Sequence, residues 1–329
     1  MNHGTEWENY WKWLLEQKGL ESYVLEMNQV DKAIRNKFNI EEICHRIYED
    51  YKTSWQAYLE TVRANFLKLL ETFQNVHLQT SRVKTIDSLL EKVIIKRHKS
   101  ICSTDNAYTT IDGTNYKNII TDLIGVRIIL NYRGNWKEIH QEILGEFPYD
   151  KTLFKKGIND EETLSHLESG ESRLVQRPKV YYAQNDEIQE YKDYGLIAKL
   201  HNKGYRSIHY IVSYQKVYIE LQVRTIYDEA WSDCDHSYVY KQDRNKSHSA
   251  LVKLSDILCQ MTNLCNDWGD NMKRIYDVES YEDIGQGTWL ADEASIEELE
   301  MAQKRLNNIS DELEKFRAHI KCKTGEKEV

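Results

Sequence analysis

Residues 217–225 read VYIELQVRT and alternate strictly between apolar and polar side chains. This period of two predicts a strand with one face on a core. The buried face would carry Val217, Ile219, Leu221 and Val223. The other face would carry Tyr218, Glu220, Gln222 and Arg224. A carboxylate, an amide and a guanidinium in a row on one strand indicate a functional face, and a solvated sheet face with cross-strand charge pairs is the alternative.

Two neighbouring segments predict the rest of a sheet. Leu123–Leu130, LIGVRIIL, is a continuous apolar run with one Gly and one Arg, which is typical of a buried strand. Ser207–Tyr214 predicts a further strand, and only Gln215 and Lys216 separate it from Val217. Two residues can form a tight hairpin turn, although neither of these favours the positive φ that such turns use.

Along the sequence, helices are expected before and after the strands of this sheet. Only two prolines occur, which suits a helix-rich chain. Apolar residues between Trp55 and Phe73 recur in steps of four and three and predict one long helix. A second series forms a heptad seam from Leu299 to Ile320 with charged flanks. We interpret this seam as a helix packed on its own domain, and a coiled-coil contact with a partner or a second subunit is the alternative. The polar segment Gly157–Glu171 predicts a surface loop or an insertion.

These patterns together predict an α+β fold with three regions. We expect a helical region at 1–74, a central domain with a β-sheet at 75–245, and a second helical region at 246–329.

The composition narrows the classes of function. Charged residues make up 29% of the chain and the net charge is -9, so a broad basic surface for duplex DNA is not expected. The six cysteines show neither a C-x-x-C pair nor the spacing of a zinc site, which indicates reduced structural thiols. No run of about 18 apolar residues predicts a membrane span, and the first residues lack the basic and apolar regions of a secretion signal. We expect a soluble cytoplasmic protein with no membrane partner.

Asp122, just before the apolar run, is the second candidate carboxylate. Asp122 and Glu220, brought together on one sheet, would make a hard oxygen site for Mg²⁺. Phosphoryl chemistry needs such a metal to neutralise charge on the transferring groups. Arg127 follows five residues later, on the opposite face by strict alternation, so a bulge near Gly125 would be needed for both to share a site. The alternative is that Asp122 is only a turn residue.

The segment 81–92, SRVKTIDSLLEK, places basic side chains just before and within a predicted helix. Arg82 and Lys84 alternate on an extended stretch and share a face, while Ser88 and Lys92 share a face of the helix that Thr85 or Asp87 would cap. Basic groups at a helix N-terminus suit a polyphosphate, and Arg82 and Lys84 could also stack on a purine. A solvated basic patch is the alternative.

The segment 203–210, KGYRSIHY, is the fourth candidate element. Gly204 allows a tight backbone, and Tyr205 beside it can offer an open ring face to a base. Ser207 and His209 lie on the same side of the strand that follows. The alternative is a loop-to-strand junction with a core Tyr.

The chain contains no G-x-x-x-x-G-K-[ST] or G-x-G-x-x-G loop and no kinase H-R-D or D-F-G, so use of ATP would not rely on those motifs.

These elements, in this order, resemble the synthetase domain of the RelA/SpoT homologue family. The segments are SRVKTIDSLLEK, TDLIGVRIIL, NKGYRSIHY and YIELQVRTIYDEAWSDCDHSYVYK, and the last resembles the small alarmone synthetases most specifically. The resemblance covers about residues 75–245. It implies a mixed β-sheet, nucleotidyltransferase-like synthetase domain with helical extensions at both ends. It also implies transfer of pyrophosphate from ATP to the 3′-hydroxyl of GDP or GTP, with Mg²⁺ as the cofactor.

The resemblance assigns roles to residues of this chain. Arg82 and Lys84 would hold the adenine of ATP, Ser88 and Lys92 its phosphates, and Arg127 would lie near the metal. Asp122 and Glu220 would be the catalytic residues and metal ligands, and Glu220 could also assist deprotonation of the acceptor hydroxyl. Tyr205 would stack on the acceptor base. The remaining residues expected at the nucleotides or around them are Lys203, His209, Gln222, Arg224 and His236.

The chain departs from the family pattern in the acceptor loop and outside the synthetase domain. His201 stands where relatives often carry a Lys, no Pro precedes the loop, and Lys199 or Lys203 could substitute. The metal-binding H-D and E-D pairs of the family's hydrolase half are not found as a set, so we expect synthesis without hydrolysis.

One alternative function is that of a toxic relative that places pyrophosphate on the 3′ end of tRNA or on an adenosine nucleotide, and the basic run Lys92–Lys99 could then contact RNA. Another is a non-catalytic binding module. The terminal helices could serve a homo-oligomer or an antitoxin-like element.

Overall fold

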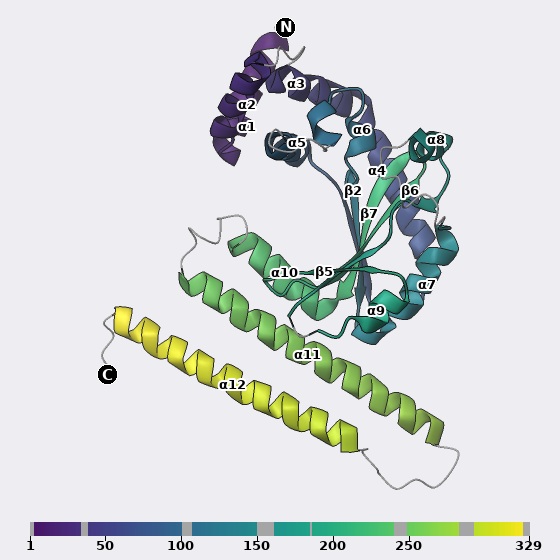
Figure 1. Ribbon diagram of the computed structural model, residues 1–329, viewed down its shortest axis with the longest axis vertical. Coiled ribbons are helices and arrows are strands. Elements are labelled where there is room, and N and C mark those ends of the chain that lie inside the picture. The colour runs from purple at the N-terminus through teal and green to yellow at the C-terminus, as the bar shows by residue number, and fades with distance from the viewer. Residues whose placement is uncertain are drawn as a thin grey trace.

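The computed structural model has a mixed sheet at its centre with helices around it (Figure 1). It describes residues 3–33, 39–100, 107–149, 161–184, 186–239, 249–282 and 293–324. The expected α+β fold with a mixed sheet flanked by helices is confirmed. Among the described helices, none is long and apolar enough to cross a membrane.

Seven strands form the sheet in the described part of the chain, and six of them follow the order β1-β2-β7-β6-β4-β5, with β3 paired to β6. The pairs β2–β7 and β4–β5 are parallel, and the other pairs are antiparallel. The strand bounds are β1 Leu78–Val83, β2 Ile124–Leu130, β3 Arg173–Leu174, β4 Lys179–Tyr182, β5 Ile197–Leu200, β6 Ser207–Tyr214 and β7 Val217–Thr225.

The helices fall into three groups along the chain. Before and within the first part of the sheet come α1 His3–Lys18, α2 Glu21–Ala33, α3 Ile40–Asp50, a π-helical turn at Tyr51–Trp55, α4 Gln56–Leu70 and α5 Ile86–Ser100. Between the sheet strands lie α6 Tyr116–Ile119, α7 Trp136–Glu146, α8 Glu161–Ser169 and α9 Gln189–Asp193. After β7 come α10 Ile226–Tyr238, α11 Ser249–Glu282 and α12 Glu293–Thr324.

The hairpin between β6 and β7 confirms both strand predictions and the two-residue turn. Gln215 and Lys216 have φ of 46° and 62°, a conformation that costs roughly 1–2 kcal/mol per non-glycine residue. Contacts from α4 hold the turn: the Tyr58 hydroxyl donates to the Gln215 carbonyl at 2.6 Å, and Asn65 Nδ2 donates to Gln215 Oε1 at 3.2 Å. Tertiary contacts therefore stabilise a turn that the two residue types do not favour.

One face of the sheet is buried under α4 and α7 (Figure 1). Val126, Ile219 and Leu221 from the sheet belong to the same buried cluster as Phe66 of α4 and Ile139 of α7. Side chains of α1, α3 and α5 continue that cluster, so the first helices share one apolar core with the sheet. This face is therefore largely packed, and Glu220, Gln222 and Arg224 lie on the other face.

Two local expectations are wrong. No bulge occurs at Gly125, because β2 pairs with β1 and β7 in unbroken register from Ile124 onward. Asp122 lies in the turn before the strand, so strand alternation does not fix its direction. The segment predicted as a loop contains the helix α8 at Glu161–Ser169, while Gly157 lies outside the described residues.

The C-terminal helices α11 and α12 run side by side (Figure 1). Ile309 of α12 is buried against Ile257 and Leu264 of α11, and Arg305 Nη1 lies 2.6 Å from Asp267 Oδ2. The predicted seam on α12 thus packs within its own chain at Ile309. The side chains of Leu299, Ala302 and Ile320 lie outside the described set.

Candidate active site

The polar face of β7 carries a chain of hydrogen bonds along the strand. Gln222 Nε2 donates to Glu220 Oε2 at 2.8 Å, and Arg224 Nη2 donates to Gln222 Oε1 at 3.0 Å. These three residues share a face because strand side chains alternate. The sequence pattern thus predicted both the face and the neighbours on it.

Glu220 is a firmly ionised carboxylate. Burial by itself would raise its pKa, but the hydrogen bond and charge of His209, the hydrogen bond from Gln222 and the charge of Lys92 outweigh burial and lower the pKa to about 2. His209 Nδ1 lies 3.5 Å from Glu220 Oε1. A partly buried carboxylate held charged in this way is typical of a site that binds cations or polarises a substrate.

Asp122 is the second carboxylate and lies between two lysines. Lys84 Nζ is 3.0 Å from its Oδ2, and Lys92 Nζ is 2.8 Å from its Oδ1. Burial would lower the pKa of Lys92, but the charges of Asp122, Tyr108 and Glu220 and a hydrogen bond to Asp122 raise it. The charges of both carboxylates therefore act on Lys92, so Asp122 and Glu220 belong to one electrostatic cluster.

Both oxygens of Asp122 have a lysine as partner in this arrangement. The partner of the buried Oδ1 is the Lys92 ammonium at 2.8 Å. A carboxylate oxygen has two lone pairs, so Oδ1 can still accept a further ligand. Within the described residues, no three His, Cys, Asp or Glu side chains cluster as a metal site.

Arg127 shares the polar face with Gln222, its register partner on β7. Its Nη1 atom lies 2.6 Å from Glu229 Oε1 and 3.4 Å from Asp233 Oδ1, both on α10. Glu229 Oε2 also lies 2.6 Å from Arg224 Nε, so this carboxylate joins the two arginines. Sequence reasoning missed Glu229. Its position one turn into the helix that directly follows the Arg224 strand was the available signal.

The segment before α5 is arranged as the pattern predicts. Thr85 caps the helix, since its Oγ1 accepts from the Ser88 backbone N–H at 3.3 Å and donates to the Ser88 hydroxyl at 3.0 Å. Lys92 follows one turn later and reaches Asp122. Arg82 is exposed and lies over Gly125, where an added Cβ would be 3.9 Å from Arg82 Cγ. A side chain at Gly125 would therefore make only an ordinary van der Waals contact with Arg82.

Tyr205 lies beside β7 in a group of rings. Its hydroxyl is 2.9 Å from His209 Nε2, and the Arg224 guanidinium lies 5.6 Å from its ring centre. The Tyr181 ring is 4.7 Å from that of His209, a neighbour that the sequence did not reveal. Burial raises the pKa of Tyr205, so its hydroxyl stays protonated at neutral pH.

Contacts with His201 and with α11 hold the loop that leads into Tyr205. His201 Nδ1 accepts from the Tyr205 backbone N–H at 3.3 Å, so the residue that departs from the family pattern supports the loop. Gly204 has φ of +81°, and a Cβ there would lie 2.4 Å from Cys259 Sγ of α11. Only glycine fits this contact. Of the other expected residues, Lys203 is exposed without an ion pair to any described residue, and His236 is exposed on α10.

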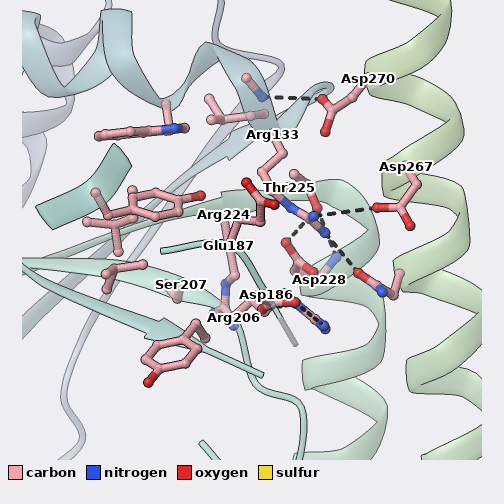
Figure 2. A pocket seen from close by; sticks show the side chains of 18 of the residues that line it. Arg133, Asp186, Glu187, Arg206, Ser207, Arg224, Thr225, Asp228, Asp267 and Asp270 are labelled. Carbon is pink, nitrogen blue, oxygen red and sulfur yellow. Dashed lines mark hydrogen bonds and ion pairs between the residues drawn. The ribbon is translucent and has the colours of Figure 1, made fainter. Parts of the chain in front are cut away.

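A separate cavity of about 700 Å³ lies where β4, β6 and β7 meet α11 (Figure 2). Among the predicted site residues, Arg224 alone lines it. Two of its arginines pair with carboxylates: Arg206 Nε lies 2.8 Å from Asp186 Oδ2, and Arg133 Nη1 lies 3.6 Å from Asp267 Oδ1 (Figure 2). The cluster around Glu220, rather than this cavity, is the candidate active site, because it holds the ionised carboxylate and the lysines.

The central part of the chain is similar to known proteins. A family model described as "Region found in RelA / SpoT proteins" matches residues 81–245. Small alarmone synthetase 1 from Bacillus subtilis has 14% identity and a TM-score of 0.43, and covers 70% of this chain and 97% of its own. Small alarmone synthetase 2 from Bacillus subtilis has 20% identity and a TM-score of 0.41, with 69% and 98% covered.

A GTP pyrophosphokinase family protein from Streptococcus pneumoniae has 16% identity and a TM-score of 0.40, and covers 74% of this chain and 95% of its own. No curated protein sequence matches the chain. The family model is therefore the decisive comparison. Because it matches half of the sequence, this chain belongs to the family of proteins that share the RelA/SpoT region.

Proposed function

We propose that this chain is a pyrophosphokinase that transfers the terminal diphosphate of ATP to the 3′-hydroxyl of GDP or GTP. The observation that carries the proposal is the ionised Glu220, linked through Lys92 to Asp122 on the polar side of the sheet. In this reaction the hydroxyl oxygen bonds to the β-phosphorus of ATP, the bond from that phosphorus to the α-phosphate oxygen breaks, and AMP leaves. The hydroxyl proton passes to solvent. The catalytic unit would be residues 75–245.

The donor would bind at Lys84, Lys92 and the start of α5. Both lysines neutralise Asp122 in the ligand-free arrangement. The phosphates of ATP would compete for these ammonium groups, and the free N–H groups at the helix N-terminus favour anions. Ser88 lies in that first turn, and the exposed Arg82 can stack on the adenine.

Asp122 and Glu220 would hold Mg²⁺. The buried Oδ1 of Asp122, whose Lys92 partner the ATP phosphates would compete for, and the charged Glu220 fit a hard cation. Mg²⁺ usually takes one or two carboxylates and completes its shell with substrate phosphates and water, so two protein ligands suffice. When bound, the metal would neutralise charge on the transferring diphosphate.

A pKa of about 2 argues against Glu220 as the base for the acceptor hydroxyl. A catalytic base works best with a pKa near the operating pH, and Glu220 lies far below neutral. We infer that Glu220 binds the metal, while Tyr205, Gln222 and Arg224 position the acceptor. Positioning and charge neutralisation would then supply most of the catalysis.

A different acceptor is the second candidate. His201 replaces the expected Lys and hydrogen-bonds the backbone of Tyr205 instead of offering a positive charge to an acceptor phosphate. This removes one contact to a phosphate of a guanosine nucleotide, so the loop departs from the family pattern at the acceptor. The 3′ end of tRNA and an adenosine nucleotide, as used by toxic relatives, are the alternative acceptors.

Transfer of label from γ-labelled ATP tests both candidates. The pure protein is incubated with Mg²⁺ and, in turn, GDP, GTP, AMP, ATP or deacylated tRNA. We expect label on GDP or GTP, and label on tRNA alone would select the second candidate. No transfer to any acceptor would refute the pyrophosphokinase proposal.

A matched pair of variants tests the site itself. Glu220→Gln should lose at least about a hundredfold in rate, since it removes a charge needed in the transition state. Glu16→Gln, at an exposed position on α1, is the control and should transfer normally. A Glu220→Gln protein with the wild-type rate would refute the site but leave the activity standing.

A further inference from the structure

The helices α3 and α4 are joined without a break by the π-helical turn at Tyr51–Trp55. The backbone N–H of Gln56 donates to the Tyr51 carbonyl five residues earlier, which is the hydrogen bond that defines such a turn. Turns of this kind are rare inside α-helices and are frequent at functional sites. One extra residue in a turn rotates the side chains that follow by about 100°, so the turn decides which residues of α3 and α4 face the rest of the protein.

Tyr51 contacts the donor side of the candidate active site. Its side chain is buried, with 1% of its surface exposed, and its hydroxyl donates to the Lys84 carbonyl at 2.5 Å. Burial and the charge of Glu60 raise the pKa of Tyr51 to about 12, so the hydroxyl keeps its proton at neutral pH and acts as the donor. Losing this contact would leave a buried polar group unpaired, which is costly. The contact therefore fixes the position of the Lys84 carbonyl.

The backbone of Lys84 is held on both sides. Its N–H donates to the Leu123 carbonyl at 2.8 Å, and its carbonyl accepts from Tyr51. Its ammonium lies 3.0 Å from Asp122 Oδ2. The turn before β2 thus holds the N–H and the side chain of Lys84, and Tyr51 supplies a third contact from another part of the chain. If ATP displaces Asp122 from the ammonium, the two backbone hydrogen bonds still hold Lys84 in place.

Asp50, the residue before the π-helical turn, connects the turn to the segment that precedes Asp122. Its Oδ2 atom accepts from the Tyr116 hydroxyl at 2.8 Å and lies 2.8 Å from Lys117 Nζ, and both of these residues belong to α6. The Lys117 ammonium also lies 4.2 Å from the centre of the Trp55 ring, a distance typical of a cation–π contact. Since α6 ends three residues before Asp122, the turn is anchored to the stretch of chain that carries this carboxylate.

These contacts surround the Lys84–Asp122 ion pair. Tyr51 holds Lys84, and its chain neighbour Asp50 holds α6. The chain then runs from α6 to Asp122, which pairs with Lys84. A lysine side chain is a flexible four-carbon stem, so the range of its ammonium depends on where its backbone is fixed. A binding group that is fixed before its ligand arrives costs less ordering on binding.

We propose that Tyr51 is a positioning residue for the donor nucleotide, because through the Lys84 carbonyl it fixes the lysine that binds ATP. This inference rests on the proposed function, since it takes Lys84 as part of the donor site. The ring of Tyr51 belongs to the buried apolar cluster, where a phenylalanine would pack equally well. The hydroxyl adds the hydrogen bond to Lys84, so its role can be separated from packing.

Binding of a non-hydrolysable ATP analogue tests the proposal without turnover. Isothermal titration calorimetry of the full chain with α,β-methylene ATP and Mg²⁺ measures the dissociation constant. Tyr51→Phe removes the hydroxyl and should raise that constant about fivefold, the size expected for one lost hydrogen bond. Tyr58→Phe is the matched control, because its hydroxyl also donates to a backbone carbonyl, that of Gln215 in the β6–β7 turn, and it should bind the analogue as the wild type does. Equal affinities of wild type and Tyr51→Phe, or an equal loss in both variants, would overturn the proposal.

A double-mutant cycle tests whether Tyr51 acts through Lys84. Lys84→Met removes the ammonium and keeps most of the side chain. Because Tyr51 positions that ammonium, Tyr51→Phe should have little further effect on the dissociation constant in the Lys84→Met background. About the same loss in both backgrounds would overturn the action through Lys84.

Label transfer separates this inference from the proposed function. In the assay with γ-labelled ATP, Tyr51→Phe should raise the KM for ATP about fivefold and leave the KM for the acceptor unchanged. A general loss of stability would not produce such a split between the two substrates. A protein that shows the difference in analogue binding but transfers no label would refute the proposed function and support the role of Tyr51. A raised KM for the acceptor alone would overturn that role.

Discussion

The charge of Glu220 links the candidate site to the stability of the fold. Its pKa is lowered from 4.5 to about 2 in the folded protein. A lowered pKa contributes stability that is present above the unfolded value and is lost as pH falls toward the folded value. The side chain is 26% exposed, so most of this contribution escapes screening by solvent. The wild type should therefore lose stability between pH 4.5 and about pH 2 for this reason alone.

The magnitude follows from the two pKa values. At about pH 5 the unfolded state binds little more proton than the folded state, and at about pH 3 it binds nearly one more. Integration gives about 2 kcal/mol of unfolding free energy lost between these pH values, from Glu220 alone. Glu220→Gln cannot titrate, so its loss should be smaller than that of the wild type by this amount.

Urea unfolding at a series of pH values measures the difference. Every other titrating group is common to both proteins, so the difference in slope isolates Glu220. Glu16→Gln, with an exposed carboxylate, is the control and should follow the wild type. Parallel stability curves for wild type and Glu220→Gln would refute the reasoning, since they would show that the surrounding His209, Gln222 and Lys92 do not hold Glu220 charged.

Three further predictions concern the site and its supports. Gly204→Ala should destabilise the chain by roughly 1–3 kcal/mol and raise the KM for the acceptor, because its φ is positive and a Cβ would meet Cys259 Sγ at 2.4 Å. Adding Cys259→Ala should recover part of the lost stability, and no recovery would contradict the contact. Asp122→Asn should reduce transfer by about a hundredfold or more and raise the Mg²⁺ concentration that gives half the maximal rate, because it removes a proposed metal ligand. A metal titration of the initial rate measures this, and an unchanged titration would exclude Asp122 as a ligand. Replacing Gln215 and Lys216 with Asn-Gly should raise the free energy of urea unfolding by about 1 kcal/mol, because both φ values are positive. A loss of stability would show that the contact of the Gln215 side chain with Asn65 of α4 contributes more than the turn conformation.

Local sequence pattern was sufficient where one residue spacing fixes one direction in space. Alternation along β7 put Glu220, Gln222 and Arg224 on one face, and the structure joins them by hydrogen bonds. The apolar run predicted β2, and the spacing of Ser88 and Lys92 predicted a shared face on α5. These statements depend only on the geometry of a single strand or helix, which the neighbouring chain cannot change.

The sequence could not predict which separate segments meet. Glu229 joins Arg127 to Arg224 because α10 folds back over β7, and Cys259 fills the space at Gly204 because α11 packs behind the loop. The turn before β2, rather than a bulge, aims Asp122 at Lys84 and Lys92.

The sequence by itself determined the strands β2, β6 and β7, the polar face of β7 and the family resemblance, because each depends on residues close together along the chain. Tertiary structure alone decided that Glu220 is held charged, that Lys92 connects it to Asp122, and that Cys259 lies against Gly204. The physical reason is that pKa, ion pairing and exposure depend on the atoms around a side chain. Those atoms come from segments far apart in the sequence.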